Sequence, residues 1–153
     1  MNVESTRRSP CAGHITIGAE GTGLSVARKL VYSLAGDVGM CDSERVELLV
    51  AVGEALSNAY VHGAADAVSH LITLDWYIRG GELTVIVKDE GSFRSREESQ
   101  RDPRFRGWGI VLMDACVDEL ILRRNGGTEV TLRKKVGGLS VTNTVSYRGS
   151  VPR

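Results

Sequence analysis

Two hairpin signals constrain the fold of this chain more than any other feature of its sequence. Each signal is a pair of segments in which apolar and polar residues alternate, with two consecutive glycines at their junction. The pairs are residues 69–79 with 82–89 around Gly80–Gly81, and residues 118–125 with 127–135 around Gly126–Gly127. Glycine pairs at such positions are typical of tight antiparallel turns. The sequence therefore predicts a sheet that is built largely from hairpins.

The remaining periodic segments predict one further strand and three helices. They are a strand over 14–20, a helix from Ser25 that Gly36 and Gly39 break, a helix from Asp42 or Ser43 to about His62, and a helix over 107–118. The resulting order, β-α-α-β-β-α-β-β, favours a mixed, mostly antiparallel sheet with helices on one face. This is an α/β fold of the α+β two-layer sandwich type, and it differs from a doubly wound Rossmann fold.

The composition is that of a single globular domain of 153 residues. Nineteen basic and nineteen acidic residues cancel, so no overall charge attracts nucleic acid or an anionic membrane. The three cysteines lack metal-ligand spacing and no apolar run is long enough to span a membrane, so a cytoplasmic location is expected. We expect a flexible leader over 1–12, one folded domain over 13–136, and a tail or weak edge strand over 137–153.

The second predicted helix carries three polar residues at helical spacing. Glu54, Asn58 and His62 lie four residues apart and project from one side of the helix. They are either a solvated stripe or a site, in which Asn58 offers an amide oxygen to Mg²⁺ and Glu54 acts as a general base. His62 could equally be a structural hydrogen bonder at the helix end.

The apolar residues of the same helix predict its buried face. We expect that face to contain Val46, Leu49, Val50, Leu56 and Tyr60. A neighbouring strip of small side chains could admit another backbone or a flat ligand, and it comprises Ala51, Ala55 and Ala59.

Two further motifs follow along the chain. Asp89 ends an apolar strand and precedes Gly91, which is compatible with a plain turn or with an acceptor aimed at an exocyclic amine such as that of adenine. Gly107 and Gly109 open a helix whose first N–H groups could bind phosphate. The preceding loop contains five arginines that could close over a triphosphate or simply be solvated, and they are Arg94, Arg96, Arg101, Arg104 and Arg106. Thr128, which begins the last strand, is the least specific signal.

These motifs together resemble the GHKL (Bergerat-fold) ATPases. EALSNAYVHG at 54–63 is similar to the N-box of that superfamily, DEG at 89–91 to its first glycine box, GWG at 107–109 to its second, and GT at 127–128 to its terminal motif. Their wording is similar in particular to the bacterial anti-sigma-factor serine kinases of the RsbW/SpoIIAB type. The resemblance covers about residues 14–136.

The resemblance implies a role for each matching residue. Glu54 would be the catalytic base and Asn58 the ligand of Mg²⁺. The nucleotide, ATP or ADP, would be bound by Asn58, His62, Gly63, Asp89, Gly91, Arg106, Gly107, Gly109, Ile110 and Thr128. The protein would be a homodimeric serine kinase and anti-sigma factor, which phosphorylates a STAS-domain anti-anti-sigma protein and sequesters a sigma factor, without binding nucleic acid or membrane directly.

Three other functions remain open at this level. The chain could be a nucleotide-gated anti-sigma module without kinase activity, or a switch kinase that acts on a STAS scaffold only. It could also be a degenerate fold with an empty pocket. The retention of Glu54 favours an enzyme, although one glutamate on a helix is compatible with every alternative.

Overall fold

The described residues of the protein form a five-stranded sheet and three helices. The computed structural model describes residues 12–18, 20–63, 71–89, 108–124 and 127–137. In chain order the elements are β1 (Ala12–Gly18), α1 (Gly21–Asp37), α2 (Asp42–Gly63), β2 (Leu71–Arg79), β3 (Glu82–Asp89), α4 (Trp108–Cys116), β4 (Glu119–Arg124) and β5 (Thr128–Lys135). This order is the predicted one. The first strand lies two residues earlier than expected, because Ala12 and Gly13 pair with β2.

The strands form one sheet in the order β1-β2-β3-β5-β4, and all of its neighbouring strands are antiparallel. Both predicted hairpins are present, β2 with β3 and β4 with β5. At the first turn, Gly80 and Gly81 have φ values of 59° and 74°. Positive φ at both central residues is the requirement of the tightest hairpin turn, and glycine adopts it without steric cost. The predicted fold class is therefore confirmed.

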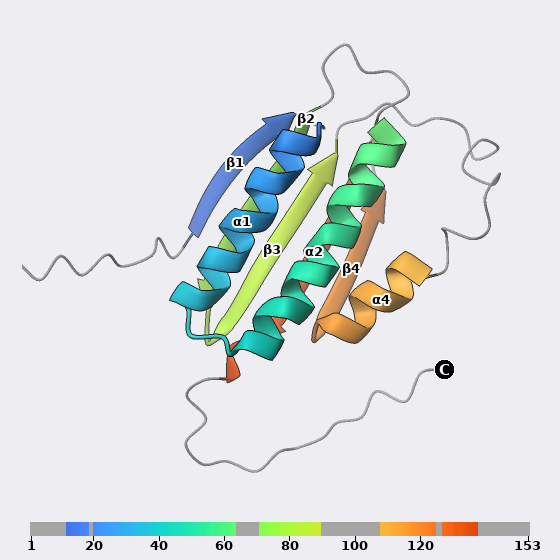
Figure 1. The fold of residues 1–153 in the computed structure, drawn as a ribbon. Coiled ribbons are helices and arrows are strands. Elements are labelled where there is room, and N and C mark those ends of the chain that lie inside the picture. Colours follow the sequence, from blue (N-terminus) through green and yellow to red (C-terminus); the bar gives the residue numbers. More distant parts are fainter. Residues whose placement is uncertain (1–11, 19, 64–70, 90–107, 125–126, 138–153) are drawn as a thin grey trace, which may run out of the picture.

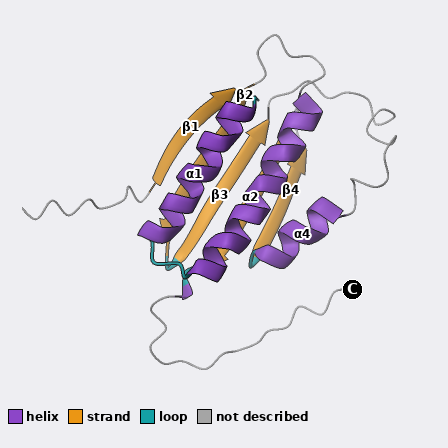
Figure 2. Ribbon diagram, viewed as in Figure 1, coloured by secondary structure: helices purple, strands orange, loops and turns teal. Residues whose placement is uncertain are grey.

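The described helices, α1, α2 and α4, cover the same face of the sheet. Figure 1 shows α1 and α2 lying side by side over the sheet and along the direction of its strands, with α4 beside α2. Figure 2 shows the resulting two layers, with the helices on one side and the strands on the other. A candidate site on these helices therefore lies on the covered side of the sheet.

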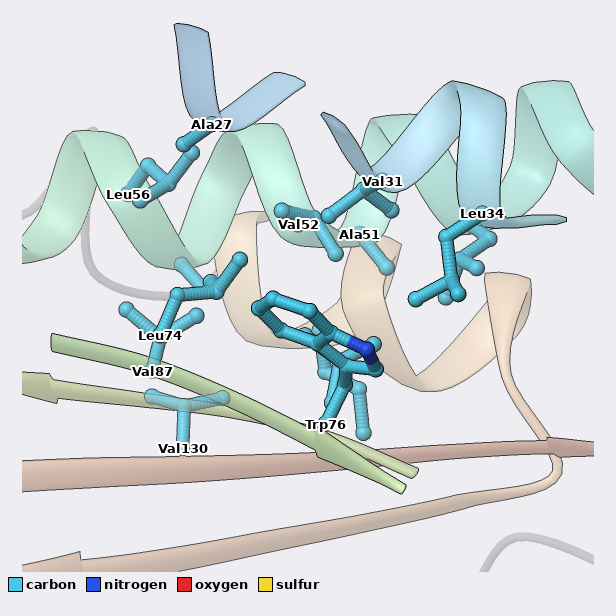
Figure 3. Packing of buried hydrophobic residues seen from close by; sticks show 14 of the residues in the cluster. Ala27, Val31, Leu34, Ala51, Val52, Leu56, Leu74, Trp76, Val87 and Val130 are labelled. Atoms are coloured by element: carbon cyan, nitrogen blue, oxygen red, sulfur yellow. The ribbon is translucent and has the colours of Figure 1, made fainter. Parts of the chain in front are cut away.

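The core fills the space between the two layers. Cross-strand neighbours Leu74, Val87 and Val130 form one row of it, and Figure 3 shows them pointing toward the helices. Trp76 stands in the next row, where its indole lies over Gly13 on the neighbouring strand. A methyl group at Gly13 would lie 2.0 Å from a carbon of that indole, so only glycine fits there.

The buried face of α2 differs from the predicted one. Its core residues are Leu48, Ala51, Val52, Ala55, Leu56 and Ala59. Of the expected set, Val46 and Tyr60 are 54% and 43% exposed, and Val50 is also exposed. The alanine strip is thus a contact with the core rather than an open surface for a ligand. Small side chains let α2 approach the sheet closely, which explains why this face is the buried one.

The boundaries of α1 and α2 also depend on contacts that the sequence alone does not display. Helix α1 continues through Gly36 to Asp37, and the guanidinium of Arg45 packs against Gly36 and over the ring of Tyr32, 3.9 Å from its centroid. Helix α2 begins at Asp42, and the carboxylate of Glu44 accepts the backbone N–H of Cys41 at 2.9 Å. Glu44 thus caps the start of α2 by accepting the N–H of the residue that precedes the helix.

The uncovered face of the sheet carries ion pairs. Asp75 on β2 accepts hydrogen bonds from His14 on β1 and from Lys88 on β3, the latter at 2.9 Å. Partial burial opposes ionisation of Asp75, but the hydrogen bonds from His14 and Lys88 outweigh it and lower the pKa of this carboxyl. The same contact raises the pKa of Lys88. The pair therefore favours the ionised forms of both groups.

Candidate functional site

Helices α2 and α4 bring the EALSNAYVHG motif and Gly109 of the GWG motif together. Glu54 and Asn58 lie one turn apart on α2, and Gly109 lies in the first turn of α4. A methyl group at Gly109 would lie 3.1 Å from Glu54 Oε2, and 3.9 and 4.0 Å from Asn58 Nδ2 and Oδ1. The two segments are about fifty residues apart in sequence, yet the backbone of one lies against the polar side chains of the other. The solvated-stripe interpretation of Glu54 and Asn58 does not account for this contact.

The start of α4 has the properties of an anion site. The first four N–H groups of a helix lack partners within the helix, and the helix dipole places positive potential there. Gly109 and the partly exposed Ile110 are among these first residues. Because Gly109 has no side chain, its backbone can approach both Glu54 and a phosphate bound between the two residues.

Asp89 and Thr128 form a second part of the candidate site. They are directly opposite each other in the β3–β5 register. Asp89 continues the alternation Leu83, Val85, Val87, so its side chain lies on the face that the helices cover, and it is only 5% exposed. A carboxylate in this position differs from the exposed aspartate of a plain turn, which was the alternative interpretation of the motif.

The last turns of α2 and the second part of the candidate site share one end of the molecule. Helix α2 packs on β3 and runs in the same direction, so its last turns and Asp89 lie at the same end (Figure 1). His62 and Gly63 are the last residues of α2 and belong to this end. Thr128 joins them because β5 starts where β3 finishes. The arrangement gathers the N-box helix, the end of β3 and the start of β5.

Some of the predicted site residues lie outside the described residues. They are Gly91, Arg106, Gly107 and the other arginines of the loop before α4. Their roles stay predictions.

Lys134 is a buried polar residue near the site that the sequence analysis missed. It takes the core-facing position after Val130 and Leu132 on β5, and it is 7% exposed. Its Nζ donates to Glu47 Oε2 at 2.7 Å and to the carbonyl of Cys116 at 2.8 Å. The signal that could have identified it is a lysine in the apolar phase of an alternating strand.

The thiol of Cys116, at the end of α4, is affected by the same surroundings. Burial, with a further contribution from the charge of Glu47, raises the pKa of Cys116, and Lys134 offsets only part of this effect. Cys116 is therefore held as a neutral thiol, which is the less reactive form.

The residues present are compatible with MgATP. An amide oxygen such as that of Asn58 is a hard ligand, and Mg²⁺ is commonly held by one or two protein ligands together with phosphates and water. No group of three or more His, Cys, Asp or Glu side chains suited to a metal ion occurs within the part of the chain that the structure describes. None of the described helices is long and apolar enough to cross a membrane.

Comparisons with known proteins agree with this fold. The family model of the histidine kinase-like ATPase domain matches residues 17–134. An anti-sigma F factor from Geobacillus stearothermophilus is 28% identical over 131 residues, which are 79% of this chain and 90% of that protein. An anti-sigma F factor from Thermoanaerobacter pseudethanolicus is 29% identical over 74% of this chain and 85% of its own.

Solved structures show the same fold. The crystal structure of the RsbU and RsbW domains of Rv1364c from Mycobacterium tuberculosis superposes with a TM-score of 0.65 and 24% identity, covering 82% of this chain and 32% of that one. A histidine kinase domain from Erythrobacter litoralis superposes with a TM-score of 0.51 and 20% identity, over 78% of this chain and 61% of its own. The family match and this fold together show that the chain belongs to the histidine kinase-like (GHKL) ATPase domain family, within which it is similar to the anti-sigma F factors.

Proposed function

We propose that this protein is an ATP-dependent serine kinase and anti-sigma factor. Its substrate would be a STAS-domain anti-anti-sigma protein, and its second partner a sigma factor. The single observation that carries the kinase part is the position of Glu54. A methyl group placed on Gly109, at the start of a helix suited to phosphate, would lie 3.1 Å from Glu54 Oε2.

The proposed reaction is transfer of the γ-phosphoryl group to a serine hydroxyl. The hydroxyl oxygen bonds to the γ-phosphorus, the bond from that phosphorus to the bridging oxygen breaks, and ADP leaves. Glu54 accepts the hydroxyl proton, and the N–H groups at the start of α4 hold the phosphate oxygens. Mg²⁺ bound at Asn58 would neutralise charge on the phosphates when present. Asp89, with Thr128 beside it, would accept a hydrogen bond from the adenine amine.

The partner assignment is supported by the relatives. The curated proteins that match across most of this chain are named anti-sigma F factors. From their name we infer that this chain also binds a sigma factor. We extend the same proposal to a homodimer and to a cytoplasmic location. Light scattering of the purified protein tests whether it forms the dimer.

The kinase proposal is tested by labelling. Purified wild-type protein, Glu54→Gln and Asn58→Ala would each be incubated with host lysate, Mg²⁺ and γ-labelled ATP, and labelled proteins would be identified by mass spectrometry. We expect one small protein to be phosphorylated on serine by the wild type, and by neither variant. Asp114→Asn is the matched control, since it neutralises an exposed carboxylate on α4 and should leave labelling unchanged.

A nucleotide-gated binding module is the second candidate. The exposed apolar side chains of α4 favour it, because Trp108 and Val111 are 75% and 58% exposed and could contact a partner. This candidate predicts MgATP binding with no label above that of Glu54→Gln.

A kinase that acts on a STAS scaffold alone predicts the label but no stable complex with a sigma factor.

A further inference from the structure

Lys134 joins three elements: β5, which carries it, and the helices α2 and α4. From β5 it reaches Glu47 on α2 and the backbone carbonyl of Cys116, the last residue of α4, at 2.7 and 2.8 Å. Its side chain is 9% exposed, whereas that of Glu47 is 51% exposed. A lysine so little exposed is rare unless its charge is paired. The ammonium therefore has a defined position beneath the two helices.

The contact has a geometric relation to the candidate site. Along α2, Glu47 precedes Glu54 by seven residues, and along α4, Gly109 precedes Cys116 by the same number. Seven residues are nearly two turns, so each pair lies on one side of its helix, about 10.5 Å apart. The Gly109–Glu54 approach and the Lys134 bridge thus form two contact points at equal spacing on two antiparallel helices.

Two contact points at equal spacing determine how far α4 can slide along α2. We propose that Lys134 is a positioning residue: its bridge from Glu47 to the Cys116 carbonyl fixes the register of α4 on α2 and so places the glycine start of α4 against Glu54. This inference rests on the proposed kinase function, whose site it concerns.

The position of the ammonium suits this role. The C-terminal carbonyls of a helix lack partners within the helix and carry partial negative charge. No basic residue occurs in the last turn of α4 itself, so Lys134 supplies the cation from a neighbouring strand. An apolar side chain of the same length would fill the space but would leave α4 free to shift along its axis.

Lys134→Met is the direct test, because methionine keeps the length and apolar volume but removes the charge and the donors. Replacement of a buried ion pair by an apolar group is often neutral for stability. We expect a melting temperature close to that of the wild type, and a kcat for phosphotransfer lower by between about tenfold and a hundredfold. The Kd for MgATP should change less than kcat, because the proposed adenine contacts, Asp89 and Thr128, lie on β3 and β5 and not on α4, the helix whose position would change.

Three further variants separate positioning from simple structural support. Lys134→Arg keeps the cation and should recover most of kcat. Glu47→Ala removes the α2 half of the bridge at a half-exposed side chain, so it should fold normally and lower kcat by a smaller factor. Lys135→Met is the matched control, because it removes the same group at the adjacent, exposed position and should leave kcat unchanged.

A measurement without nucleotide keeps this inference separate from the kinase proposal. Hydrogen exchange of the α4 amides should be faster in Lys134→Met than in the wild type, while exchange in β3 should be unchanged. Wild-type protein that never transfers phosphate would contradict the kinase proposal, and the exchange result would still test the bridge. A kcat of Lys134→Met equal to that of the wild type would overturn the positioning role, and so would unchanged hydrogen exchange in α4. If Lys134→Met does not fold, a wild-type kcat in Glu47→Ala would overturn it instead.

Discussion

Gly109→Ala should separate the stability of this protein from its activity. Alanine is favoured over glycine inside helices by about 1 kcal/mol, and by less in the first turn, where Gly109 lies. The variant should therefore melt at the wild-type temperature or up to roughly 4 °C above it, as expected for a domain of this size. On helix propensity alone, this substitution is neutral or favourable.

The same methyl group should reduce activity. It would lie 3.1 Å from Glu54 Oε2, which is tighter than most real contacts of a Cβ atom, so the carboxylate must move by a few tenths of an ångström. Small displacements of catalytic groups have large effects on rate, and we expect kcat/KM for phosphotransfer to fall by about tenfold, or ~1.4 kcal/mol.

The control for this experiment is Gly53→Ala. Gly53 precedes Glu54 in the interior of α2, and a methyl group there would meet only Arg28, at 3.6 Å or more, which is an ordinary contact. This variant should gain stability through the same propensity effect and keep its activity. Thermal melts and initial phosphotransfer rates of both variants test the contrast. Full activity in Gly109→Ala would show that the close approach of α4 to Glu54 is not required.

Three other predictions concern stability and reactivity. Gly13→Ala should lower the free energy of unfolding by about 1–3 kcal/mol in denaturant titrations, because the methyl group would displace the indole of Trp76. The pKa of Asp75 is lowered in the folded state, so this residue should stabilise the protein above the ordinary carboxyl pKa of about 4 and lose this effect as the pH falls below it. In acid titrations, Asp75→Asn should therefore show a shallower loss of stability than the wild type, and an unchanged slope would contradict the assignment. The pKa of the Cys116 thiol is raised, so Cys116 should be alkylated more slowly at pH 8 than the exposed Cys41. Mass spectrometry of the separated peptides measures both rates, and equal rates would contradict this prediction.

The sequence by itself determined the elements of this protein and the residues of its motifs. Alternation with period two and glycine pairs are local properties, so the β2–β3 and β4–β5 hairpins could be predicted from short segments. The helical spacing of Glu54 and Asn58 is local in the same sense, and both residues do share one side of α2. Asp89 was predicted at the end of its strand for the same reason.

Only the tertiary structure decided which surfaces meet. Helix α2 has apolar residues on more than one side, so its pattern alone could not show that the alanine strip is buried while Val46 and Tyr60 are exposed. The approach of Gly109 to Glu54 joins residues from separate helices, and the bridge from Lys134 to Glu47 spans 87 residues. Such contacts depend on how the layers pack, because the interaction energy of two distant residues exists only after the chain has brought them together.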